Sequence, residues 1–315
     1  MVTFGRLVFK ATGVLSNRGL AKNSRIIGKK IAQHAKNNGG KLNTAEVKRI
    51  VEDTVGKKAA SRINFLDRKA FKEQALRQGI PDAHIDVMFQ NCGGITSSNK
   101  YTRQADIFIN ENFAQGADGV NVVTHELQHA LSSTSGKLSV TRGIFGKFSR
   151  GRKYIDKMQV KSVQADIGNK YMLPYKSAVQ QTQESGKAIT LDEARRLLFE
   201  KGGLIPGKNK ENIYILKNLK ALYQDEARSF SVGFGAADVY RGAPLPIYQE
   251  QILTMQNLSL AAKQELRQAR LARIKSFFGI KHKPAPMEQP PISQAEPVMF
   301  KKAENIVDRN LFQKS

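Results

Sequence analysis

The chain of 315 residues carries 51 Lys and Arg against 27 Asp and Glu, a formal net charge of +24, and 40% of its residues are hydrophobic. This composition predicts a folded protein with a sizeable core and excludes a disordered polycation. Cys92 is the only cysteine, which excludes a disulfide framework and a Cys-rich zinc module. No apolar run approaches the roughly 20 residues of a membrane-spanning helix, and the basic N-terminus lacks the apolar segment of a secretory signal.

The basic residues are distributed unevenly and divide the chain into four expected parts. Residues 1–41 contain nine Lys and Arg and no Asp or Glu, which predicts a basic N-terminal arm. Residues 42–250 have a balanced composition and are expected to form the main domain. Residues 251–280 predict a basic C-terminal helix, and residues 281–315, with five prolines, predict a disordered tail.

The basic arm is the feature that points to a partner other than a substrate. Its short apolar stretches between basic residues suit an anionic surface, either membrane lipid or nucleic acid. A start without acidic residues also resembles an organelle transit peptide or a bacterial delivery signal. We therefore expect a cytoplasmic protein, or one that is delivered to another cell or compartment.

The first half of the main domain predicts short helices and one strand. Asn43 precedes a helical pattern through Val55, and Asp67 precedes another through about Gln78, because both side chains can cap a helix N-terminus. Residues 105–110 alternate between an apolar and a more polar face. This alternation predicts a short strand.

The second half predicts longer helices. Thr190 begins a helix with a capping-box sequence. Residues 212–231 predict a long helix, which we expect to end where Gly233 and Gly235 follow. A last helix is expected at residues 259–278.

The pattern that carries chemistry is His-Glu-x-x-His, formed by His125, Glu126 and His129 on a helix expected at residues 120–131. Residues four apart lie one turn apart on the same helix face, so the two imidazoles can converge on one metal ion. Glu126 is offset from that ion. It suits a general base that takes a proton from a metal-bound water.

Chance is a poor explanation of this pattern. The His and Glu content of the chain leads to an expectation of about 0.004 matches. The pattern also lies on an amphipathic helix that follows a strand, which is the context that the motif requires. The alternative is a pair of surface histidines on an ordinary helix.

The sequence around the motif resembles the active-site helix of zincin metallopeptidases, in the segment Thr124-His125-Glu126-Leu127-Gln128-His129-Ala130. The resemblance covers residues 100–240 and rests on this short motif. It implies an α+β fold that is mainly helical, with a small mixed sheet whose edge strand precedes the motif helix and aligns the substrate. Residues 105–110 are where that edge strand is expected. The resemblance further implies Zn²⁺ as cofactor and a protein or peptide as substrate.

The third metal ligand distinguishes the branches of this family. Metzincins continue the motif with a glycine and a histidine, at positions where this chain has Ser132 and Ser135, so that branch is excluded. The other histidines lie in the basic arm, ahead of the motif and beside the tail, as His34, His84 and His282. We therefore expect a carboxylate as the third ligand.

The long helix expected after the motif supplies the best candidate. Leu219, Tyr223 and Phe230 mark its buried stripe, and Glu226 falls on that stripe. Burying a carboxylate alone is costly, and a metal ion would remove that cost. In the gluzincin branch the third ligand is a glutamate on a helix C-terminal to the motif, and Glu226 in its Asp-Glu-Ala context resembles it. A structural salt bridge to a nearby Lys or Arg is the alternative role.

Two other carboxylates remain rivals for the third position. Asp225 is adjacent to Glu226 but turned about 100° away from the stripe. Asp238 lies in a segment that loosely resembles the Gly-Thr-x-Asp-x-x-Tyr-Gly element of aspzincins, although the threonine is missing and the tyrosine is one position early.

Two supporting roles also need residues. An electrophile that stabilises the oxyanion should lie near the metal, and Tyr223, Arg228 and Tyr240 are the candidates close to Glu226 in sequence. Thermolysin-like enzymes orient a ligand histidine with an aspartate four residues after the ligand glutamate. Phe230 occupies that place here, so Ser229 or another carboxylate would have to serve.

These observations favour a zinc-dependent metalloendopeptidase in which His125, His129 and Glu226 bind zinc and Glu126 activates the attacking water. The alternative is a basic protein that binds nucleic acid or an anionic membrane and has a non-catalytic or structural zinc site. Net charge favours this alternative, but it describes attraction rather than catalysis.

Overall fold

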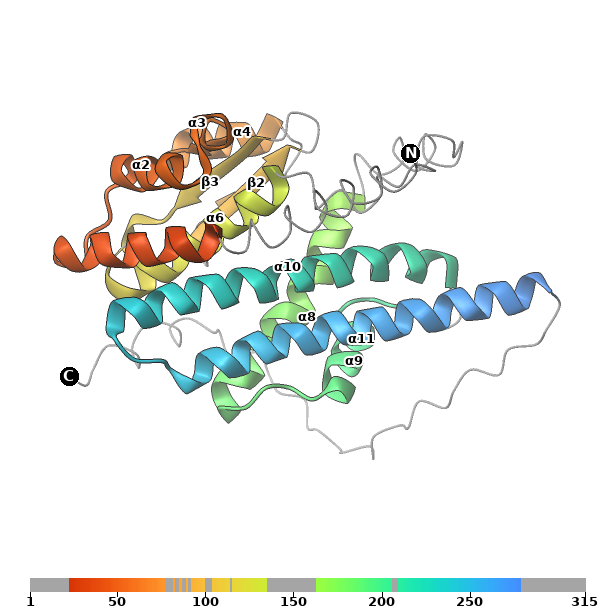
Figure 1. The fold of residues 1–315 in the computed structure, drawn as a ribbon. Helices are drawn as coiled ribbons and strands as arrows, with labels where there is room; N and C mark the ends of the chain where they lie inside the picture. Colours follow the sequence, from red (N-terminus) through yellow and green to blue (C-terminus); the bar gives the residue numbers. More distant parts are fainter. Residues whose placement is uncertain are drawn as a thin grey trace, which may run out of the picture. The chain divides into compact units, whose positions relative to one another are not determined.

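The computed structural model describes residues 23–77, 92–99, 104–113, 115–134, 163–205 and 209–278, together with residues 82, 85, 86 and 89. These residues form a mainly helical structure with one small mixed sheet, so the expected α+β class is confirmed (Figure 1). The first part of the expected basic arm, residues 1–22, and the expected tail, residues 281–315, lie outside the described residues. In the described part of the chain no helix is long and apolar enough to cross a bilayer.

The sheet contains β1 (Ile63–Phe65), β2 (Gly94–Asn99) and β3 (Gln104–Ile109) in the order β1-β3-β2. β3 pairs in parallel with β1 and antiparallel with β2, where Thr96 lies opposite Ile107. The strand expected at residues 105–110 is therefore the central strand. Its assignment as the edge strand was wrong, and β2 is an edge strand instead.

Burial on both faces of β3 explains this correction. Ala105 and Ile107 on one face belong to the core that lies against the motif helix. Phe108 on the other face packs between the rings of Phe71 and Phe89, with ring centroids 5.9 and 4.7 Å away. A strand that is covered on both faces is typical of the centre of a sheet.

The helices on the N-terminal side follow their expected signals. α2 (Thr44–Val55) is capped by Asn43, whose side chain accepts a hydrogen bond from the amide of Ala45. α4 (Arg68–Arg77) begins after Asp67, which accepts from the amide of Ala70 at 2.8 Å. A four-residue helix, α3 (Lys57–Ala60), lies between α2 and β1.

Residues 23–37 of the expected basic arm form a helix within the main core. Ile27, Ile31 and Ala35 are buried in the same apolar cluster as the motif helix. The basic side chains of Arg25 and Lys29 lie on the exposed side. The described part of the arm therefore contributes to the core as well as to the positive surface.

Four helices form a second apolar cluster, which includes Leu198, Leu219 and Met255. They are α8 (Val163–Ser185), α9 (Leu191–Glu200), α10 (Asn209–Arg241) and α11 (Pro246–Phe277). α9 begins with the expected capping box, in which the side chains of Thr190 and Glu193 bond to each other's backbone amides.

α10 is longer than its sequence predicted. It passes through Gly233 and Gly235 and ends at Arg241, before Gly242 with φ of 86°. A Cβ atom at Gly233 would lie 2.4 Å from Oδ1 and 2.9 Å from the carbonyl oxygen of Asn121 on the motif helix. Gly233 is thus required for close packing of two helices and does not end its own helix.

Substituting the two glycines tests this packing. We expect Gly233→Ala to lower the free energy of unfolding by about 1–3 kcal/mol, because the new methyl group overlaps Asn121. Gly235→Ala is the matched control, because a Cβ atom there meets nothing within 4 Å, and it should raise stability by about 0.5–1 kcal/mol through helix propensity. Urea unfolding measures both changes. Equal effects of the two substitutions would contradict the packing role.

Candidate metal centre

The motif lies on α6 (Gly116–Thr134), which covers the sheet on one side and packs against α10 on the other. Val123, Leu127 and Ala130 are buried in the core beside the sheet, as the apolar stripe predicted. The side chains of His125 and His129 point from α6 toward α10. The spacing of the stripe therefore determines which way the two histidines face.

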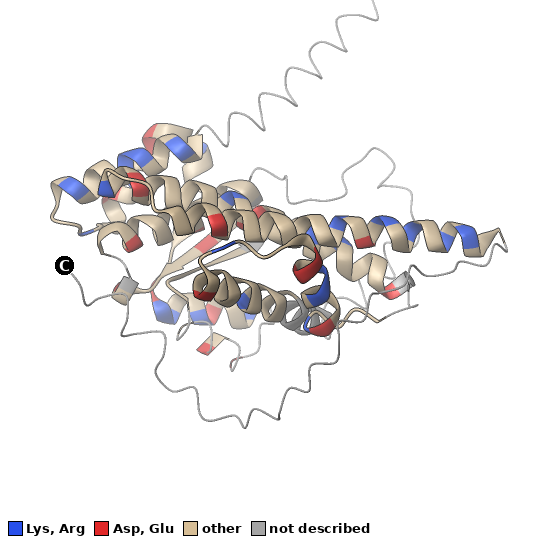
Figure 2. Ribbon diagram, turned by 90° about the horizontal axis from the view of Figure 1, so that it is seen from below, with Lys and Arg blue, Asp and Glu red and all other residues tan. Residues whose placement is uncertain are grey.

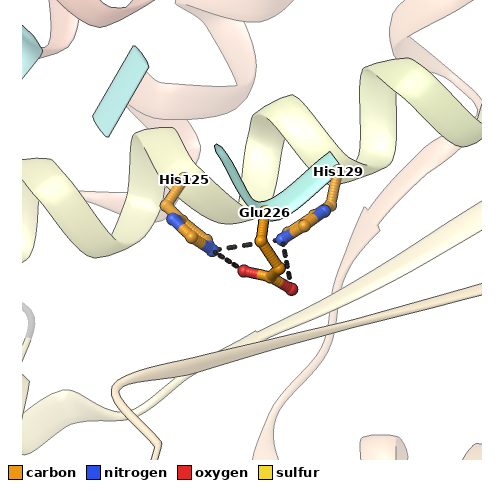
Figure 3. A group of neighbouring side chains, drawn as sticks. All are labelled: His125, His129 and Glu226. Atoms are coloured by element: carbon orange, nitrogen blue, oxygen red, sulfur yellow. Dashed lines mark hydrogen bonds and ion pairs between the residues drawn. The ribbon is translucent and has the colours of Figure 1, made fainter. Parts of the chain in front are cut away.

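The structure brings His125 and His129 together with Glu226 from α10 (Figure 3). The Nε2 atoms of the two histidines are 3.1 Å apart. Glu226 places Oε2 at 3.3 Å from Nε2 of His125 and Oε1 at 3.4 Å from Nε2 of His129. All three side chains are partly buried.

These separations fit a shared metal ion. Donors about 2.0–2.1 Å from a tetrahedral ion lie about 3.3 Å from one another. The separation of 3.1 Å between the two Nε2 atoms is close to that value, and each imidazole lies 3.3 or 3.4 Å from one of the two oxygens of Glu226. The group could therefore hold a metal ion and leave a fourth position for another ligand.

The charges in this group also favour a cation. Burial alone would raise the pKa of Glu226, but the two imidazoles outweigh it and hold that pKa well below its ordinary value. Burial alone would lower the pKa of His129, but Glu226 and then Asp225 raise it well above its ordinary value. Without a metal the group therefore retains a proton, which a metal ion must displace on binding.

Asp225 lies behind the group and not within it. Its Oδ2 atom is 2.7 Å from Nδ1 of His129, on the ring nitrogen opposite the one that meets Glu226. A carboxylate there accepts a hydrogen bond from Nδ1–H, so Nε2 is the nitrogen that would bind a metal ion after the ion displaces its proton. Asp225 thus fills the orienting role that the sequence left open, and Phe230 instead packs its ring edge-on against His125 at 4.7 Å.

Asp238 lies far from this group. It is twelve residues after Glu226 on the same helix, which corresponds to about 18 Å. Its carboxylate accepts from the amide of Leu245 at 3.3 Å and pairs with Arg241 at 3.7 Å. Asp238 therefore stabilises the turn between α10 and α11.

Glu126 is held against the edge strand β2. Oγ1 of Thr96 lies 2.6 Å from Oε2 of Glu126 and 3.0 Å from its carbonyl oxygen. A Cβ atom at Gly94 would lie only 2.6 Å from Cγ of Glu126, so glycine leaves room for that side chain. Thr96 and Gly94 carry no sequence signal of their own, because their role depends on the pairing of β2 beside α6.

None of the three electrophile candidates near Glu226 in sequence faces the group. Tyr223 is fully buried, and its hydroxyl donates to the carbonyl oxygen of Tyr171 at 3.1 Å. Arg228 is exposed and about 200° around the helix from Glu226. Tyr240 is fourteen residues away along α10, about 21 Å.

Two tyrosines on α8 lie beside the group and were missed by the sequence analysis. Burial raises the pKa of both Tyr171 and Tyr175, and the charge of Glu226 raises both further. Glu126 also raises the pKa of Tyr175, and the ring of Tyr175 stacks on Phe230, which packs against His125. No periodicity could reveal these residues, because α8 carries no motif.

Comparison with known proteins found no match among family models, curated proteins or solved structures.

Metal affinity tests the role of Asp225. Asp225→Asn keeps the size of the side chain but removes the charge that fixes the protonation of His129. We expect the metal dissociation constant to rise about 10–100-fold, measured by competition with a chelating dye. Asp238→Asn removes the same charge from the distant end of α10 and should leave the constant unchanged. An unchanged constant for Asp225→Asn would contradict the orienting role.

Proposed function

We propose that the chain is a zinc-dependent metalloendopeptidase of the zincin type. The observation that carries this proposal is that His125 and His129 of α6 lie together with Glu226 of α10. Glu126 directly follows His125 on α6. Two imidazoles and one carboxylate with a fourth position open are the donor set of catalytic zinc sites that hydrolyse peptides.

A zinc ion in this group would act as a Lewis acid and lower the pKa of a water molecule at its fourth position. Glu126 would be the general base that accepts a proton from that water. Thr96 holds the Glu126 carboxylate through a contact of 2.6 Å, and Glu126 is almost completely buried. A base fixed in this way needs little reorganisation when it accepts the proton.

The sheet edge supports an extended peptide as the substrate. β2 pairs with β3 on one side, and no described strand pairs with its other side. Thr96 in this strand already contacts Glu126, so a peptide paired along the free edge would lie beside the base. Backbone pairing of this kind accepts internal segments of a chain, which favours endopeptidase action.

Tyr175 is the best candidate to polarise the carbonyl group that is attacked. Its ring stacks against Phe230 with centroids 6.4 Å apart, and the charges of Glu226 and Glu126 both raise the pKa of its hydroxyl. Phe230 in turn packs against His125. Burial raises the pKa of Tyr175 well above its ordinary value, so the hydroxyl keeps its proton and can donate it to a developing oxyanion.

Glu126→Gln tests the proposed reaction. The zinc-loaded protein is incubated with a mixture of peptides from a digested denatured protein, and new termini are identified by mass spectrometry. We expect the variant to retain zinc and to lose about 10²–10⁴-fold in rate, because only the base is removed.

Glu52→Gln, which removes an exposed carboxylate on α2, should cleave at the wild-type rate. The proposal fails if the zinc-loaded wild type produces no new termini, or if Glu126→Gln cleaves as fast as the wild type.

Tyr175→Phe tests the electrophile. Loss of one donor to the oxyanion should lower kcat about 10²–10³-fold while KM and zinc content stay near those of the wild type. Tyr240→Phe removes a hydroxyl at the far end of α10 and serves as the control. A change in KM alone would assign Tyr175 to substrate binding.

A further inference from the structure

The outward face of α11 exposes a row of large apolar side chains. Leu253, Leu260, Leu271 and Ile274 are 43%, 40%, 47% and 54% exposed. Residues seven apart on a helix differ by only about 20° in direction and residues eighteen apart by about 0°, so Leu253, Leu260 and Leu271 share one stripe, with Ile274 about 60° from Leu253. The opposite side of α11 is buried in the second apolar cluster.

Positive charge flanks this stripe. Lys263, Arg267, Arg270 and Arg273 are exposed along the same part of α11, where Figure 2 shows a row of basic positions. Within the described part of the chain, none of these four residues pairs with a carboxylate.

The acidic residues of α11 do not offset this charge. Glu250 accepts a hydrogen bond from the amide of Ala188 at 2.7 Å. Glu265 is buried and pairs with Nε of Arg195 at 2.5 Å. Both carboxylates are used inside the protein, so the outward face presents apolar groups, cations and the neutral glutamines Gln256, Gln264 and Gln268, but no acidic side chain.

The chemistry of this face selects its occupant. A second copy of the same face would bring like charges together, and a nucleic acid would bind the cations but leave the leucines in water. An anionic bilayer accepts both, because its phosphates bind Arg and Lys while its acyl boundary takes up Leu and Ile. We propose that the outward face of α11 between Leu260 and Ile274 binds anionic membrane surfaces peripherally. This inference does not depend on the proposed peptidase activity.

Vesicle sedimentation of the full-length chain tests the proposal. We expect binding to vesicles of phosphatidylcholine mixed with phosphatidylserine and much weaker binding to phosphatidylcholine alone. The double variants Leu271→Ser/Ile274→Ser and Arg270→Gln/Arg273→Gln should each lower the partition coefficient at least about tenfold.

Matched controls remove the same chemistry elsewhere. Leu76→Ser removes an apolar side chain of similar exposure, 44%, and Lys57→Gln/Lys58→Gln removes the same charge from exposed positions on α3. Both should bind as the wild type does.

Three results would overturn the proposal. One is a wild type that does not bind the anionic vesicles, and another is binding that the α11 variants leave unchanged. The third is binding that depends on the arginines but not on Leu271 and Ile274, which would indicate a purely electrostatic surface such as one for nucleic acid.

Discussion

The close approach of α6 and α10 is the constraint on which the candidate centre depends. Gly233 removes the side chain that would otherwise separate the helices, so that a Cβ atom there would lie 3.2 Å from Cβ of His125. Glu226 is seven residues earlier, two turns along the same face of α10. It therefore meets His129 as well as His125.

The close packing of α6 and α10 also places charged side chains in a buried environment. A buried carboxylate without a partner costs several kcal/mol, and Glu226 and Asp225 are adjacent on the inward side of α10. Two imidazoles from the neighbouring helix offset that cost in the absence of metal. A divalent cation would offset it further, and its binding would stabilise the folded state by linkage. Buried carboxylates between α6 and α10 are thus costly for helix packing alone, but they favour the binding of a metal ion.

Local periodicity explains what the sequence could predict. The apolar stripe of α6 orients His125 and His129, and the stripe through Leu219 and Tyr223 placed Glu226 toward a core. Caps such as Asn43 were also readable, because their hydrogen bonds join residues close together in sequence. These features are encoded within a few turns of one helix.

Features that depend on contacts between distant segments could not be predicted. A glycine such as Gly233 is typical of a helix end. Only its proximity to Asn121 shows that it allows α10 to pack closely against α6. β3 was assigned to an edge because the resemblance to zincins implied an edge strand there, and its alternation does not reveal that Phe71 covers its second face. Tyr175 belongs to a helix without a motif, and only the fold brings its ring onto Phe230, which packs against His125.

X-ray absorption at the zinc edge of the reconstituted protein tests the central claim most directly. The account predicts one bound zinc per chain with a first shell of nitrogen and oxygen donors, and with the outer-shell scattering of two imidazoles. Cys92 is the only thiol of the chain, and burial raises its pKa, so no sulfur should appear in the first shell. A protein that retains no zinc, or a zinc ion bound by sulfur, would contradict the centre formed by His125, His129 and Glu226.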